Sequence, residues 1–189
     1  MKSKIVTTAI AFALYAALSL PAEEVMQEGG KESGQPAELE VIKGSIGVWD
    51  AEVEVWPNGP DNAAMKMKGV ETVEAHGQYW LASDLSVDFN GEKMVVHSVV
   101  GYDLDEKKLT GWAVDQGPYK AKMVGEYDKD KKMVKWTIHG KNVDGSKMTQ
   151  HTEITQSSDS ERRLVLYMPG EDDKLRKQMV ITYKKRKQK

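Results

Sequence analysis

Apolar and polar residues alternate with a period of two along most of the chain after residue 48. In the stretch WDAEVEVW, Trp49, Ala51 and Val53 fall on one face and the acidic residues fall on the other. Successive side chains of a β-strand point to opposite faces of a sheet, so this pattern predicts a half-buried strand over residues 49–56. The prolines, glycine and asparagines of the next segment, PNGPDN, then end the strand.

Further strand-like runs follow at regular intervals. They cover residues 65–75, 78–89, 93–102, 108–115, 119–127, 132–139, 146–155, 163–168 and 176–183. The breaks between them, such as FNGE, DQGP and NVDGS, are typical of hairpin turns. Ten short strands joined in this way predict an all-β, antiparallel up-and-down sheet that closes into a barrel and so has no free edges. Only AELEVIK, residues 37–43, predicts a helix, which is short and precedes the first strand.

The N-terminal residues predict a targeting segment. Lys2 and Lys4 precede an uncharged run that ends at Leu20, and small residues follow, which is the order of a secretory signal peptide. The run of about 16 residues is shorter than the roughly 20 that a membrane-spanning helix needs. We therefore expect residues 1–22 to be cleaved, after Ser19 or Ala22, and the protein to be exported to the periplasm or the extracellular space without stable membrane insertion.

The remaining chain divides into a leader and one domain. Residues 23–36 are acidic and Gly-rich with few large apolar side chains, a composition typical of a flexible leader. Residues 37–187 then form a single barrel domain, in keeping with a length of 189 residues. The composition does not indicate an oligomeric state.

Charge and cysteine content exclude several classes of partner and of chemistry. The chain has 27 basic and 29 acidic residues, a net charge of −2 and no basic stripe, so we expect no nucleic-acid partner. It has no cysteine, which excludes disulfides, thiolate metal sites and thiol nucleophiles.

Two segments nearly repeat each other: VGYDLDEKKLTGW at residues 100–112 and VGEYDKDKKMVKW at residues 124–136. Each contains the Asp-x-Asp spacing that begins a calcium loop. A calcium loop also needs Gly at its sixth position and Glu at its twelfth, where these segments have Lys or Met and then Val or His. The repeat therefore predicts two hairpin tips whose Asp side chains bind nearby backbone N–H groups.

No motif of a known reaction is present. The chain lacks a phosphate-binding loop, a G-x-S-x-G sequence and a His-Glu-x-x-His sequence. Its four histidines lie far apart along the chain, and its ten methionines are scattered in a way typical of core filler. We therefore expect no catalytic residue, no metal and no cofactor, and an enzyme is the third interpretation.

The phase of one strand decides what the barrel contains. Either Trp112 faces inward and Asp115 outward, or the reverse, and Glu71 on another strand is also in phase with apolar neighbours. We expect Trp112 inside, because burying an indole is favourable by roughly 25 cal/mol per Å² whereas burying an unpaired carboxylate is costly. The candidate ligand-binding residues are Trp112, Tyr102, Trp80, Asp115 and Met123.

Several blocks also carry a family resemblance. GSIGVWDAEVEVW, GQYWLASDL, VGYDLDEKKLTGWAVDQ and QMVITYKKR resemble, in order and spacing, the bacterial domain-of-unknown-function family 1579, over about residues 39–186. Gly77-Gln78-Tyr79 stands where that family tends to have two glycines. The resemblance implies a calycin-like barrel, as in lipocalins and nitrobindin, frequent export and no established activity.

A shorter resemblance concerns the start of the first strand. Gly47-Val48-Trp49 resembles the lipocalin G-x-W signature, which implies that Trp49 closes one barrel end beneath a late basic side chain, Lys185 or Arg186.

Two functions remain open. The first is binding of a small, largely apolar molecule in the barrel, because barrels of this size can enclose a ligand-sized cavity. The second is a structural or interaction module whose interior is filled by methionine and aromatic side chains. The volume of the interior distinguishes the two.

Overall fold

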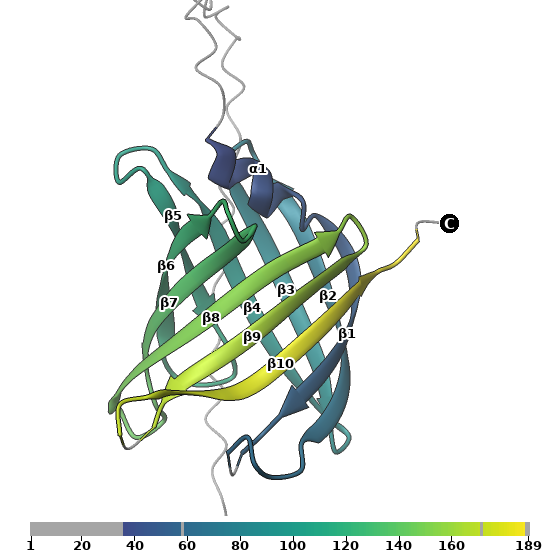
Figure 1. Ribbon diagram of the computed structural model, residues 1–189, viewed down its shortest axis with the longest axis vertical. Coiled ribbons are helices and arrows are strands. Elements are labelled where there is room, and N and C mark those ends of the chain that lie inside the picture. Colours follow the sequence, from purple (N-terminus) through teal and green to yellow (C-terminus); the bar gives the residue numbers. More distant parts are fainter. Residues whose placement is uncertain (1–35, 58, 171, 188–189) are drawn as a thin grey trace, which may run out of the picture. The chain divides into compact units, whose positions relative to one another are not determined.

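The computed structural model describes residues 36–57, 59–170 and 172–187. In this part of the chain, ten antiparallel strands form a closed barrel in which β1 pairs with both β2 and β10 (Figure 1). The strands are β1 (Gly47–Val55), β2 (Met65–His76), β3 (Trp80–Phe89), β4 (Glu92–Asp103), β5 (Lys108–Val114), β6 (Lys120–Asp128), β7 (Met133–Lys141), β8 (Lys147–Ser158), β9 (Glu161–Pro169) and β10 (Leu175–Lys185). The predicted fold class and its ten strands are confirmed. The predicted signal peptide at residues 1–22 and leader at residues 23–36, except Pro36, lie outside the described residues.

The alternation seen in the sequence is the inside–outside alternation of the barrel. On β1, Trp49, Ala51 and Val53 are buried, whereas Asp50 and Glu52 are exposed. The register carries the inner face from strand to strand, because residues paired across two strands point to the same side. Trp49, for example, lies opposite Glu71 on β2, which therefore also faces inward.

The two repeated segments form two hairpin tips, as predicted. In the first tip, Asp103 Oδ1 accepts hydrogen bonds of 2.9 Å from the backbone N–H groups of Asp105 and Glu106. In the second tip, Asp128 Oδ1 accepts one of 3.1 Å from the N–H of Lys131. Lys107 and Lys132 occupy equivalent places near the end of each turn, with φ of 51° and 49°. The two tips therefore have the same construction.

Beyond the tips, the two repeats lose their common phase. Leu109 and Val134 each lie two residues after the positive-φ lysine, and both are buried in the barrel core. The tryptophan of the second repeat, Trp136, follows Val134 by two residues and is also buried. The tryptophan of the first repeat, Trp112, follows Leu109 by three residues and lies on the outer face, where it is 44% exposed. One extra residue thus places two similar tryptophans on opposite faces of the barrel.

The helix α1 (Ala37–Lys43) is confirmed within the bounds predicted for it. It lies at the upper end of the barrel in Figure 1, near β4 and β5, and its buried residues Leu39 and Ile42 pack into the barrel core. The indole N–H of Trp49 donates a 2.7 Å hydrogen bond to the carbonyl of Ser45, between the helix and β1. Within the described residues, no helix is both long and apolar enough to cross a membrane.

Candidate functional site

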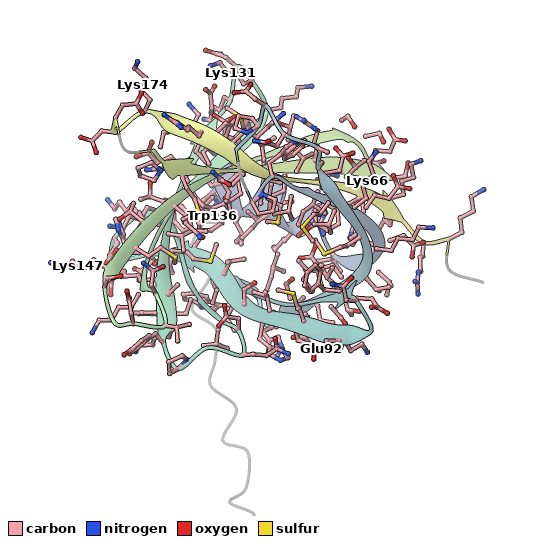
Figure 2. The ribbon with its side chains drawn as sticks, turned by 90° about the horizontal axis from the view of Figure 1, so that it is seen from below. Lys66, Glu92, Lys131, Trp136, Lys147 and Lys174 are labelled. Carbon is pink, nitrogen blue, oxygen red and sulfur yellow. The ribbon has the colours of Figure 1, made fainter. Side chains whose placement is uncertain are left out.

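The barrel contains a cavity of about 510 Å³. Ile42 of α1 lines it at one end, which we call the α1 end. Tyr119 and Asn142, from the loops that follow β5 and β7, line it at the other end, the far end. In the view from below in Figure 2, Trp136 lies within the ring of strands, whereas Lys66 and Lys147 lie around the outside. The apolar walls include Val73, Leu85, Val100, Met123, Trp136, Ile138, Leu164 and Ile181.

A polar cluster interrupts these walls. Arg162 on β9 donates a hydrogen bond from Nη2 to Glu71 Oε2, and Ser83 on β3 donates one from Oγ to Glu71 Oε1. All three residues line the cavity, and the side chains of Arg162 and Glu71 are only 6% and 12% exposed. The ion pair is therefore largely withdrawn from bulk water. Each buried charge is stable there only because the other compensates it.

Two aromatic rings hold the Arg162 guanidinium. Its central carbon lies 4.5 Å from the centre of the Trp49 ring and 4.2 Å from that of Tyr183. Cations are attracted to the faces of such rings, most strongly where water is excluded. Among the described residues, the buried Nε of Arg162 has no hydrogen-bond partner. The guanidinium is thus held by ring faces and Glu71, and its Nε–H is buried without an acceptor.

Tyr183 completes the cluster. Burial raises the pKa of its hydroxyl well above the ordinary value of 10.0, and the Glu71 carboxylate raises it further, while Arg162 acts in the opposite direction. The tyrosine therefore stays neutral over the physiological pH range and adds no charge to the Glu71–Arg162 pair.

Only some of the predicted site residues line the cavity. Met123 and Asp115 line the cavity, but Trp112 does not, so the expectation that Trp112 faces inward is wrong. The reason is that Asp115 lies just beyond the end of β5 and is exposed, where its Oδ1 accepts a 2.7 Å hydrogen bond from the N–H of Gly117. Asp115 can therefore lie on the inner side of the strand without the free-energy cost of burying its carboxylate. Outside the barrel, Lys120 Nζ covers Trp112 at 4.4 Å from the ring centre.

Tyr102 and Trp80 do not line the cavity either. Tyr102 is half-buried and packs against the core. Trp80 is half-buried on β3 opposite Gly101 of β4, and a Cβ at that glycine would come within 2.5 Å of the indole ring. Their roles in the structure are packing roles at the strand pairs that they join.

Two central cavity residues were not among the predicted site residues. Trp136 is the inward tryptophan of the repeated pair, and a count from the hairpin tip to each tryptophan shows the difference of one residue. Arg162 precedes the strand predicted at residues 163–168, but it is in phase with Leu164 and Leu166, which also line the cavity. The alternation along this strand could therefore have indicated that Arg162 faces inward. Glu71, for which the sequence left an inward position open, does face inward.

Of the two basic side chains expected over Trp49, the structure places Lys185 there and Arg186 elsewhere. Lys185 does lie over the Trp49 ring, at 5.1 Å from its centre, and it passes 2.7 Å from where a Cβ of Gly47 would be. Arg186 instead binds Asp50 on the outer face, with its Nε and Nη2 2.8 and 2.6 Å from Oδ1. The basic group nearest to the ring centre is Arg162, which comes from a different strand.

The described residues do not include a group of three or more histidine, aspartate or glutamate side chains that could hold a metal ion. His97, for example, pairs with Asp84 on the outer face, away from the cavity. The cavity wall offers the cluster around Glu71 and Arg162, other polar side chains such as Ser98 and Gln150, and apolar surface.

Comparison with solved structures finds the same architecture. The crystal structure of Rv2717c from M. tuberculosis is 9% identical, with a TM-score of 0.62 over 80% of this chain and 99% of that one. The S-type phycobiliprotein lyase CPES from Guillardia theta is 10% identical, with a TM-score of 0.53 over 79% of this chain and 93% of that one. At these identities the similarity shows the fold alone. Comparison with curated proteins found no match.

The fold and its cavity define a protein built as a closed, ten-stranded antiparallel β-barrel with an open interior. A family model described as "Protein of unknown function (DUF1579)" matches residues 36–185, which is most of the chain. The chain belongs to this family, as its sequence blocks indicated.

Proposed function

We propose that this protein binds a small, largely apolar molecule inside the barrel. The observation that supports the proposal is the cavity of about 510 Å³. Binding sites for small molecules are commonly clefts or cavities of about 300–1,000 Å³ with mainly apolar walls and a few polar groups. The cavity has this size and this composition, because its walls are mainly aliphatic, methionine and aromatic side chains, with an ion-paired cluster and further polar groups such as Ser98 and Gln150 among them.

The interior is also not filled in the way that a purely structural module would require. Met123, Met148 and Met179 line the cavity, yet the space between the walls persists. Gly140 and Ala121 also face it with minimal side chains. A close-packed core leaves few voids larger than a water molecule, so an open volume of this size favours binding over the structural alternative.

We also propose that the protein is exported before it acts. The support is the signal-peptide pattern of residues 1–22. Fractionation of the source cells, with an antibody against the barrel, tests this proposal. Expected is a protein in the periplasmic or extracellular fraction whose N-terminus begins near residue 20 or 23. A full-length protein in the cytoplasm would contradict export.

Native mass spectrometry tests binding directly. Protein purified from its own host should carry a small molecule that leaves when the protein is denatured. A matched pair of variants on β5 then locates the site. Ala113→Trp places an indole inside the cavity and should clearly reduce retention, whereas Trp112→Ala alters the adjacent outer position and should leave retention unchanged.

The result that favours the structural alternative is equally definite. If the host protein carries no small molecule, and no apolar dye binds at micromolar concentration, the barrel is a scaffold. Equal binding by wild type and Ala113→Trp would place the ligand outside the cavity.

A further inference from the structure

We propose that the ligand carries an uncharged hydrogen-bond donor, such as a hydroxyl group, and that this group binds Glu71 and Ser83 at the α1 end of the cavity. The apolar body of the ligand then extends along the walls toward the far end. This inference rests on the proposed function and specifies the chemical class of the ligand.

The first argument is the direction of the hydrogen bonds in the cluster. An ionised carboxylate is an acceptor only, with about four lone-pair sites. Arg162 and Ser83 each donate to one oxygen of Glu71, and the Tyr183 hydroxyl also hydrogen-bonds Glu71, which leaves about one of the four lone-pair sites free. Ser83 has used its single proton in this bond, so its oxygen also offers only lone pairs. Both groups line the cavity and present acceptors to it, and a matching ligand group must be a donor.

The second argument is charge. Arg162 neutralises Glu71, and both are largely buried. A ligand carboxylate would bring an unpaired negative charge next to Glu71, and a ligand ammonium would bring an unpaired positive charge next to Arg162. Burying an uncompensated charge is costly. An uncharged donor adds a hydrogen bond without disturbing this balance.

The third argument is the position of the cluster within the cavity. Trp49 and Tyr183 enclose Arg162, and its Nε is buried, so the guanidinium has little surface left for a ligand. The capacity that faces the cavity lies on Glu71 and Ser83. The polar group of the ligand therefore meets acceptor oxygens at the α1 end, while Met123, Ile138 and Leu166 surround its apolar part.

Three ligands of equal chain length test the inference. Nile red, a neutral apolar dye, is bound to the protein and displaced at about pH 8, where a fatty acid is ionised. Decanol offers a hydroxyl donor, decyl methyl ether keeps the oxygen without the donor, and decanoate carries a charge. Because a hydrogen bond to a charged group is stronger than one between neutral groups, decanol should displace the dye at concentrations at least about tenfold lower than the other two.

Glu71→Gln tests the role of the carboxylate. This variant preserves the shape of the side chain but leaves Arg162 without its counter-ion, so the preference should shift from decanol toward decanoate. Asp84→Asn is the matched control, because it makes the same carboxylate-to-amide change on the outer face, where Asp84 pairs with His97 and does not line the cavity. Its order of preference should equal that of wild type. If Glu71→Gln does not fold, the three ligands on wild type decide the matter.

The outcomes separate the two proposals. If Nile red binds but the ether displaces it as well as decanol does, or decanoate displaces it best, the inference is overturned and the cavity remains a binding site. If neither the dye nor any of the three ligands binds, the proposed function fails and the inference fails with it.

Discussion

Glu71 on β2 and Arg162 on β9 form an ion pair inside the barrel, although 91 residues separate them in the sequence. Barrel closure brings these strands to the same interior, because β1 and β10 join the two ends of the sheet between them. The pair lies beside Trp49 and Tyr183 and lines the cavity.

Removing one charge of this pair should destabilise the barrel more than replacing both charged residues by apolar ones. Arg162→Met leaves the Glu71 carboxylate buried without its partner and should lower the free energy of unfolding by about 3–5 kcal/mol. The double variant Glu71→Leu/Arg162→Met removes both charges and should lose clearly less. Urea unfolding of wild type, Glu71→Leu, Arg162→Met and the double variant measures the difference. Additive losses from the two single variants would show that the two charges act independently.

Trp49 should be a major contributor to stability. It is fully buried, it packs in the core with Leu39, and Arg162 lies against its ring. Trp49→Ala should therefore lower the free energy of unfolding by about 3–5 kcal/mol, the usual cost of deleting a large core aromatic. Trp112→Ala removes the same side chain from the outer face and should cost about 1 kcal/mol or less, as surface substitutions do. Equal losses in chemical denaturation would contradict the placement of the two tryptophans.

Alkaline pH should destabilise the barrel through Tyr183. The pKa of this hydroxyl is raised in the folded state above its ordinary value of 10.0, so the folded protein holds the proton more tightly than the unfolded chain. Its contribution is fully present below about pH 10 and is lost as the pH rises toward the folded-state pKa. Tyr183→Phe should flatten the fall in unfolding free energy above pH 10. A Tyr183 that ionises at the ordinary pKa in a spectrophotometric titration of the native protein would refute this.

Calcium should leave the melting temperature unchanged. Asp103 and Asp128 already accept hydrogen bonds from the backbone of their own turns, and each tip supplies too few further oxygens for a shell of about six to eight. Thermal unfolding with and without millimolar calcium measures this. A rise in melting temperature that disappears in Asp103→Asn/Asp105→Asn would reveal a site at the first tip.

Local patterns in the sequence were sufficient for the architecture. The period of two predicts strands because side chains of an extended chain alternate between faces, and turn residues separate the strands because only certain conformations reverse the chain. The helix at residues 37–43, the ten strands and the two hairpin tips could all be derived in this way. These features depend on neighbours within a few residues, which the sequence displays directly.

Which side chains face the interior of the barrel was decided by the tertiary structure. Trp112 and Trp136 have similar sequence surroundings, but a difference of one residue after the turn reverses the face, and only the register of the paired strands establishes which one is inside. Asp115 could face inward without a buried charge because β5 ends just before it, so its surroundings include solvent. Arg162 meets Glu71, Trp49 and Tyr183 only after the barrel closes. Closure joins residues that are distant in sequence, and their mutual distances are set by packing among all ten strands rather than by any local pattern.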